Sequence, residues 1–180
     1  MTRLYNHYRE SMPRQRRLVK NSEVIKVGDF VVQEGAGVAN VDAKTEDIAG
    51  FCTGFTDRKG ISLDSITHDS NYGGGSYNAS TKTFTAASDN ETDAQVYVEF
   101  YEIQENDQLV VTLDDDKGKT SGSDIPGGYF GISTTDSSLL DESDYNAAPA
   151  NLQFQSLITS GENLGDREIV VRVIRRQSNL

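Results

Sequence analysis

The chain has 180 residues, of which 36% are hydrophobic and 25% are charged, and its formal net charge is −11. This length suits one good-sized domain, and the low apolar content predicts a thin core. No run approaches the roughly 18 apolar residues that span a bilayer and no signal peptide is evident, so we expect a protein made in the cytoplasm. Its negative charge disfavours binding to nucleic acid or to anionic membranes.

The charges are unevenly distributed. Residues 21–165 carry a net charge of −18, whereas residues 1–20 carry a net charge of about +5. The cations of this first segment are Arg3, Arg9, Arg14, Arg16, Arg17 and Lys20. With few apolar side chains and with Pro13 opposing a helix, residues 1–22 are predicted to form an extended basic N-terminal arm, followed by one β-domain over residues 23–180.

The first half of this domain carries clear strand signals. Residues 24–32 flank a Gly-Asp turn with β-branched residues, and a second strand is predicted over 37–41. Residues 48–55 form a third, with two Gly-Phe pairs that suit a tight bend. Residues 64–93 are rich in Ser, Thr, Asn, Asp and Gly, and are expected to form a long loop with at most one short strand near 83–86.

The second half begins with alternating apolar residues from 96 to 103 and a turn into 108–113, which predicts a β-hairpin. Residues 114–128 and 136–151 are polar loops, the second with one expected helical turn at 138–141. Short strands are predicted at 129–133, 152–158 and 168–174. The fold class expected is all-β, a single β-barrel or β-sandwich (tulip-like) domain with long polar loops.

Residues that could support catalysis are sparse. The only histidines, His7 and His68, fall in the arm and in a polar loop, so a Ser-His-Asp triad or a three-histidine zinc site would need flexible segments. The single cysteine, Cys52, excludes an internal disulfide and is expected to be buried and inert. Because the chain has 28 carboxylates, two that lie close together would be weak evidence for a catalytic pair. We therefore predict neither enzymatic activity nor a cofactor.

Other motifs are weak. The Asp114–Asp116 run with Asp124 could chelate calcium, but its spacing departs from an EF-hand loop, and a plain acidic loop is the simpler interpretation. Gly73–Gly75 lacks the Gly-Lys-Ser/Thr of a phosphate-binding loop. The sequons at Asn78 and Asn90 are interpreted as coincidences.

The basic arm is the one feature with a specific functional interpretation. Its six cations could anchor on an acidic surface of a neighbouring protein, could bind nucleic acid, or could belong to a tail without a partner. The acidic body argues against nucleic acid, so the six cations are the candidate partner-binding residues.

Residues 24–55, with Val-Gly-Asp-Phe-Val-Val, a glycine turn and Ile-Ala-Gly-Phe, resemble the opening of tailed-phage capsid decoration (cement) proteins. The resemblance implies a compact β-barrel or tulip-like domain in a trimeric, late structural protein on the virion exterior. It would bind the major capsid protein between subunits and stabilise the shell. The long loops at 64–93 and 114–151 exceed what a minimal decoration protein needs.

The alternative is a carbohydrate- or cell-surface-binding β module of the fibre or adhesin type. Its candidate contacts are four loop tyrosines: Tyr72, Tyr77, Tyr129 and Tyr145. The absence of tryptophan weakens this alternative. A hydrolase is a third possibility, and we expect no turnover.

Overall fold

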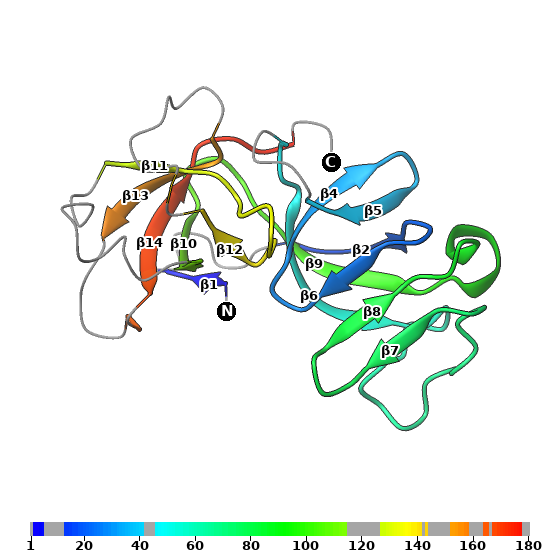
Figure 1. Cartoon of the computed structure of the whole chain (residues 1–180). Coiled ribbons are helices and arrows are strands. Elements are labelled where there is room, and N and C mark those ends of the chain that lie inside the picture. The colour runs from blue at the N-terminus through cyan, green and yellow to red at the C-terminus, as the bar shows by residue number, and fades with distance from the viewer. Residues whose placement is uncertain are drawn as a thin grey trace. The chain divides into compact units, whose positions relative to one another are not determined.

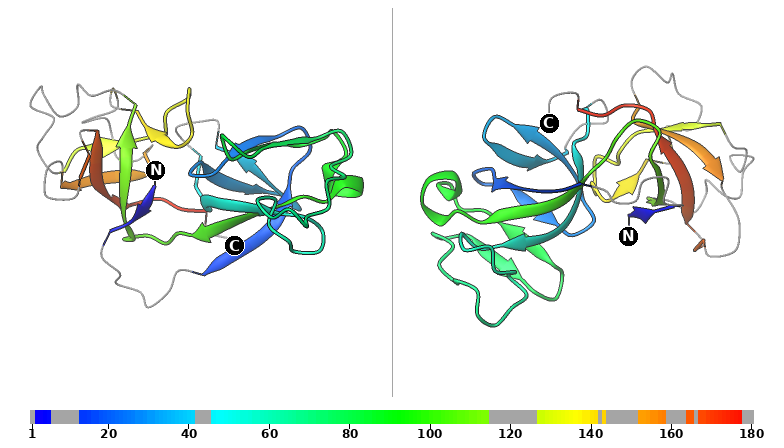
Figure 2. Two further views of the ribbon diagram at one scale, coloured as in Figure 1. Left: turned by 90° about the horizontal axis from the view of Figure 1, so that it is seen from below. Right: turned by 180° about the vertical axis from the view of Figure 1, so that it is seen from behind.

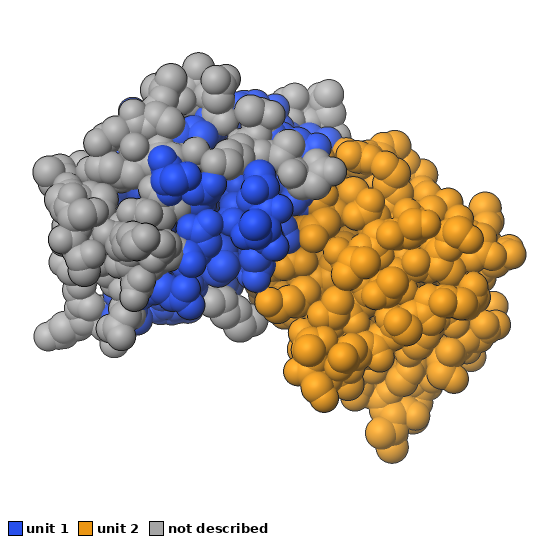
Figure 3. Space-filling view, in the orientation of Figure 1, with its two compact units in different colours: residues 1–11, 41–48, 103–179 blue, residues 12–40, 49–102, 180 orange. Residues whose placement is uncertain are grey.

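The structure is a computed structural model of the whole chain. It describes residues 2–5, 13–41, 46–114, 127–141, 143, 152–158, 164–165 and 167–177 (Figures 1 and 2). The chain divides into two compact units, shown in different colours in Figure 3. The barrel unit comprises Met12–Asn40 and Ala49–Glu102, and the sheet unit comprises Met1–Ser11, Val41–Ile48 and Ile103–Asn179.

The barrel unit is built around a closed barrel with the strand order β2-β5-β4-β6-β9. All neighbouring strands in it are antiparallel except β2 and β5, which are parallel. Its strands are β2 (Arg14–Val19), β4 (Phe30–Glu34), β5 (Gly37–Asn40), β6 (Gly50–Thr56) and β9 (Tyr97–Glu102). At Gly50 any side chain would collide with the backbone, because a Cβ there would lie 2.0 Å from the carbonyl oxygen of Tyr101.

A smaller sheet with the order β3-β8-β7 completes this unit. Its strands are β3 (Val24–Lys26), β7 (Ser76–Asn78) and β8 (Thr83–Thr85), and a short π-helix, η1 (Asn90–Ala94), precedes β9. The barrel and the small sheet share one hydrophobic core, to which β3 contributes Ile25, β8 contributes Phe84 and β9 contributes Phe100. The small sheet therefore covers part of the barrel's apolar surface rather than standing alone.

The sheet unit consists of one sheet with the order β1-β10-β14-β13-β11, and β12 pairs in parallel with β10. Its strands are β1 (Arg3–Leu4), β10 (Gln108–Leu113), β11 (Tyr129–Phe130), β12 (Leu139–Leu140), β13 (Phe154–Ile158) and β14 (Glu168–Val173). All the apolar side chains of β10 and β14 are buried, so both faces of these strands are covered: Leu109, Val110, Val111 and Leu113 on β10, and Ile169, Val170, Val171 and Val173 on β14.

The all-β fold class is confirmed, and a closed barrel is present. The expected division into an arm over 1–22 and one domain over 23–180 differs from the structure. β2 lies inside the predicted arm but is a barrel strand, and β1 pairs with β10. The chain also forms two units rather than one. In the described part of the chain, no helix is long and apolar enough to cross a membrane.

The hairpin predicted over residues 96–113 is wrong in its pairing. Both strands exist, but β9 pairs with β2 and β6, and β10 pairs with β1, β12 and β14. Residues 104–107 do form a turn, with Asn106 at φ 72° and the Gln104 N–H bonded to the Asp107 carboxylate at 2.7 Å. This turn carries the chain from one unit to the other, and both edges of β9 are already occupied.

Two further local predictions are corrected. The loop at 64–93 contains two strands, β7 and β8, because Phe84 supplies a core side chain that a polar composition conceals. The helical turn at 138–141 is replaced by β12, where Leu140 is fully buried and Leu139 pairs with Thr112.

Candidate interaction face

One side of the barrel presents arginines and tyrosines together. β2 and β9 pair with Arg14 opposite Tyr101 and Arg16 opposite Glu99. Because side chains alternate along a strand, these side chains lie on the outer face of β2 and β9, whereas Val98 and Phe100 lie on the other face, in the core. We call Arg14, Arg16, Tyr97, Glu99 and Tyr101 the basic-aromatic face.

Arg14 is an accessible cation of this face, with 56% of its side chain exposed. Its guanidinium lies 5.3 Å from the ring centre of Tyr101 and donates a hydrogen bond of 3.3 Å to the hydroxyl of the same residue. That hydrogen bond raises the pKa of Arg14. Glu99 stands 4.0 Å away, at the outer limit of an ion pair. The guanidinium is thus oriented by a ring and keeps donors for a further carboxylate.

Arg16 is more firmly fixed. Its guanidinium lies 3.6 Å from the ring centre of Tyr97, donates through Nε to Thr56 Oγ1 at 2.9 Å and donates through Nη2 to the Asp57 carbonyl at 2.7 Å. The side chain therefore crosses β9 to reach the end of β6. Its donors link strands, so Arg16 stabilises the face and is less suited than Arg14 to bind a partner.

The other arm cations do not gather on this face. Arg17 occupies the opposite side of β2 by alternation and is half-buried. Lys20 is paired with Glu34, and Arg3, in the sheet unit, is paired with Glu168. Arg9 lies outside the described residues. The structure thus brings together two of the six predicted cations, each on a tyrosine.

The tyrosine and acidic partners of this face were missed by sequence reasoning. Tyr97, Glu99 and Tyr101 alternate along one strand, which was visible, but their importance depends on the pairing of β2 with β9. A basic strand without apolar alternation gave no signal for that pairing.

Two of the four tyrosines of the carbohydrate alternative pack against the core. Tyr72 and Tyr77 lie against the hydrophobic core of the barrel unit. Tyr72 also stacks on His68, with ring centres 5.9 Å apart, and the Tyr77 hydroxyl donates to Asp64 at 2.6 Å. Tyr129 accepts a hydrogen bond of 3.3 Å from Gln155. Tyr145 lies outside the described residues.

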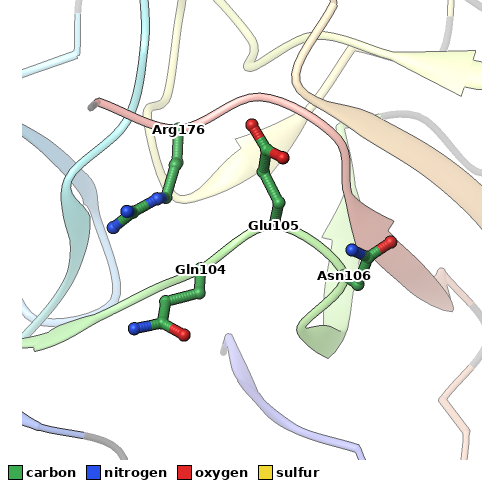
Figure 4. Close-up of a pocket in the computed structure, with 4 residues that line it drawn as sticks. All are labelled: Gln104, Glu105, Asn106 and Arg176. Atoms are coloured by element: carbon green, nitrogen blue, oxygen red, sulfur yellow. The ribbon is translucent and has the colours of Figure 1, made fainter.

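Within the described residues no group of three His, Cys, Asp or Glu side chains could hold a metal ion. Most of the Asp114–Asp116 run, together with Asp124 and His7, lies outside those residues. An open pocket in the sheet unit, shown in Figure 4, is lined by two amides, one carboxylate and one guanidinium: Gln104, Asn106, Glu105 and Arg176.

Several isolated residues have structural roles. Cys52 is buried, and burial raises the pKa of its thiol far above the ordinary value. Asn90 is fully buried and Asn78 is exposed, so of the two sequons the one at Asn78 is accessible in the folded chain. At Gly73 and Gly74 the backbone adopts positive φ, which explains glycines there without a phosphate.

Comparison with known proteins adds no relative: no family model, no curated protein and no solved structure matches this chain.

Proposed function

We propose that this protein is a non-enzymatic structural component of a tailed-phage virion, a decoration protein that binds the outer capsid surface between major capsid subunits. The observation that carries the proposal is the basic-aromatic face, which presents Arg14 on an otherwise acidic chain. The segment that resembles decoration proteins, residues 24–55, corresponds to β3 through most of β6 and so supplies three of the five barrel strands.

The mechanism is recognition of acidic groups on the shell. The ring and the hydroxyl of Tyr101 orient the Arg14 guanidinium, so less conformational entropy is lost when a carboxylate binds. A single exposed ion pair contributes little, about 1 kcal/mol or less. Self-association as a homotrimer would multiply this contact through effective concentration. Sedimentation equilibrium of the purified protein measures that assembly directly.

The test is co-sedimentation with cognate capsids that lack the protein. Removing residues 1–20 is unsuitable, because it deletes the barrel strand β2. Arg14→Gln is compared instead with Lys59→Gln, which removes one charge from an exposed cation outside the basic-aromatic face. Saturable binding that Arg14→Gln weakens and Lys59→Gln leaves intact supports the proposal. No binding by the unmodified protein overturns it.

A further inference from the structure

Four polar side chains form one row across the sheet unit. Tyr129 on β11 lies opposite Gln155 on β13. Arg172 on β14 lies between Gln155 on one side and Gln108 of β10 on the other. Opposite residues of neighbouring strands share one face of a sheet and lie about 5 Å apart, and all four side chains are partly exposed. We call these residues the cross-strand polar row; the strands that carry it lie side by side in Figure 1.

The amide of Gln155 is held from both sides. Arg172 Nη2 donates a hydrogen bond to Gln155 Oε1, and Gln155 Nε2 donates one of 3.3 Å to the hydroxyl of Tyr129. Because an amide accepts through its oxygen and donates through its nitrogen, these two bonds fix its orientation. The guanidinium of Arg172 is thus positioned by a neutral side chain, which leaves its charge uncompensated.

Arg172 is a cation without a counter-charge. Its Nε–H is buried and has no hydrogen-bond acceptor, and its guanidinium takes part in no ion pair, among the residues that the structure describes. A buried charged donor that lacks an acceptor destabilises a folded chain. Such a donor therefore calls for an acceptor from outside the chain, which is either water or a bound anion.

The surroundings of Arg172 differ in charge from the rest of this acidic chain. The sequence has 28 acidic residues. Six cations of the described residues lie at most 4.0 Å from a carboxylate: Arg3, Arg14, Lys20, Arg58, Lys82 and Arg175. Beside Arg172 on the same face, however, the next opposite pair is Val110 and Val170, which are both buried. The acid beyond them on β14, Glu168, is already paired with Arg3.

We propose that the cross-strand polar row is an oxyanion-binding site, in which Arg172 contacts the charged oxygens of a carboxylate or a phosphate. The planar guanidinium presents its donors in a fork that matches two oxygens of either group. The Tyr129 hydroxyl, the second N–H of the Gln155 amide and the Gln108 amide supply neutral donors in the same row. Because Gln155 already holds the guanidinium, little side-chain entropy is lost on binding.

The test is a titration of the purified protein with sodium acetate and, separately, with inorganic phosphate, followed by ¹H–¹⁵N spectra of the arginine Nε–H groups. Ionic strength is held constant with sodium chloride, which alone serves as the control. The Arg172 Nε–H signal, identified by its absence in Arg172→Lys, should shift saturably with at least one of the two anions. A shift with acetate alone assigns the site to carboxylates, and a shift with phosphate alone assigns it to phosphates.

Variants then test whether Arg172 is the charged contact. Their affinities are measured at the backbone amide of Gln155, which all of them retain. Arg172→Gln removes the charge and should weaken binding about tenfold or more. Arg172→Lys keeps the charge without the fork, so its affinity should lie between those two. Arg167→Gln is the matched control, because it removes an exposed cation just before β14 and should leave the affinity unchanged.

The outcomes for this site are independent of capsid binding, since the cross-strand polar row lies in the sheet unit and the basic-aromatic face lies in the barrel unit. If neither anion shifts the Arg172 Nε–H, or if chloride shifts it equally, its donors are hydrated and the oxyanion site is refuted. Equal affinity in Arg172→Gln and Arg167→Gln also refutes it. Should Arg172→Gln fail to fold in thermal unfolding, the titration of the unmodified protein decides.

Discussion

The structure predicts that Asn90 holds the start of β9 to the end of β2. Its side chain is 0% exposed; the amide donates to the carbonyl oxygens of Val19 at 2.5 Å and Val96 at 3.2 Å and accepts from the Val96 N–H at 3.1 Å. Asn90→Ala removes three buried hydrogen bonds and leaves the Val96 N–H without its partner. At about 1 kcal/mol for each bond, with an added cost for the orphaned donor, the expected loss in the free energy of unfolding is about 2–4 kcal/mol.

The assay is urea unfolding followed by far-ultraviolet circular dichroism, together with hydrogen exchange at the Val96 amide. Asn78→Ala is the control: Asn78 is exposed, and its Oδ1 accepts from the Ser80 N–H at 3.0 Å and the Thr81 N–H at 3.2 Å, so its loss should cost less than about 1 kcal/mol. If Asn90→Ala costs no more than this control, or if exchange at Val96 is not accelerated, the role assigned to Asn90 is incorrect.

Three further predictions concern other parts of the chain. Arg16→Lys loses the planar stacking on Tyr97 and should lower the stability of the barrel unit by about 1–2 kcal/mol in thermal unfolding; an unchanged melting curve would contradict the contact. The hydrogen bonds from Arg3 lower the pKa of Glu168 to about 2, below its ordinary value near 4.5. The stability this pair contributes is therefore complete above about pH 4.5 and is lost as the pH falls towards 2. Glu168→Gln should reduce the difference in stability between pH 7 and pH 3 by about 1 kcal/mol, a small value because Arg3 is exposed. Cys52 should resist a thiol reagent at pH 8 in the native protein and react in urea, because it is buried and its pKa is raised by burial; rapid native labelling would refute this.

The sequence predicted strands well where the signal is local. The segments at β9, β10 and β14 were placed nearly to their ends, since the alternation in β9 and the β-branched and other apolar residues of β10 and β14 are properties of each strand alone. Pairing was not predictable in the same way. The hairpin interpretation of β9 and β10 used proximity in the sequence, whereas the observed pairing depends on which strands fill one barrel core.

The prediction of an extended N-terminal arm failed for a different reason. In β2, three of six residues are arginines, so composition indicated an arm. Arg14 and Arg16 are tolerated because tyrosine rings on β9 receive them, and this partner lies more than eighty residues away in the chain. A cation–aromatic pair between distant segments leaves no periodic signal in either one.

The charge asymmetry of the sequence acquires a structural explanation from these pairs. A basic segment preceding an acidic body suggests an external partner, yet much of the attraction is satisfied within the chain, by Arg3 with Glu168 and by Lys20 with Glu34. Exposed ion pairs of this kind contribute modestly to stability, but a cation held in such a pair is less available to bind another protein. An anchoring role for the N-terminal segment therefore depends on cations that keep unused donors at the surface. Among the described arm residues that condition is met best by Arg14, so the effect of Arg14→Gln on capsid binding carries more information than any truncation of the segment.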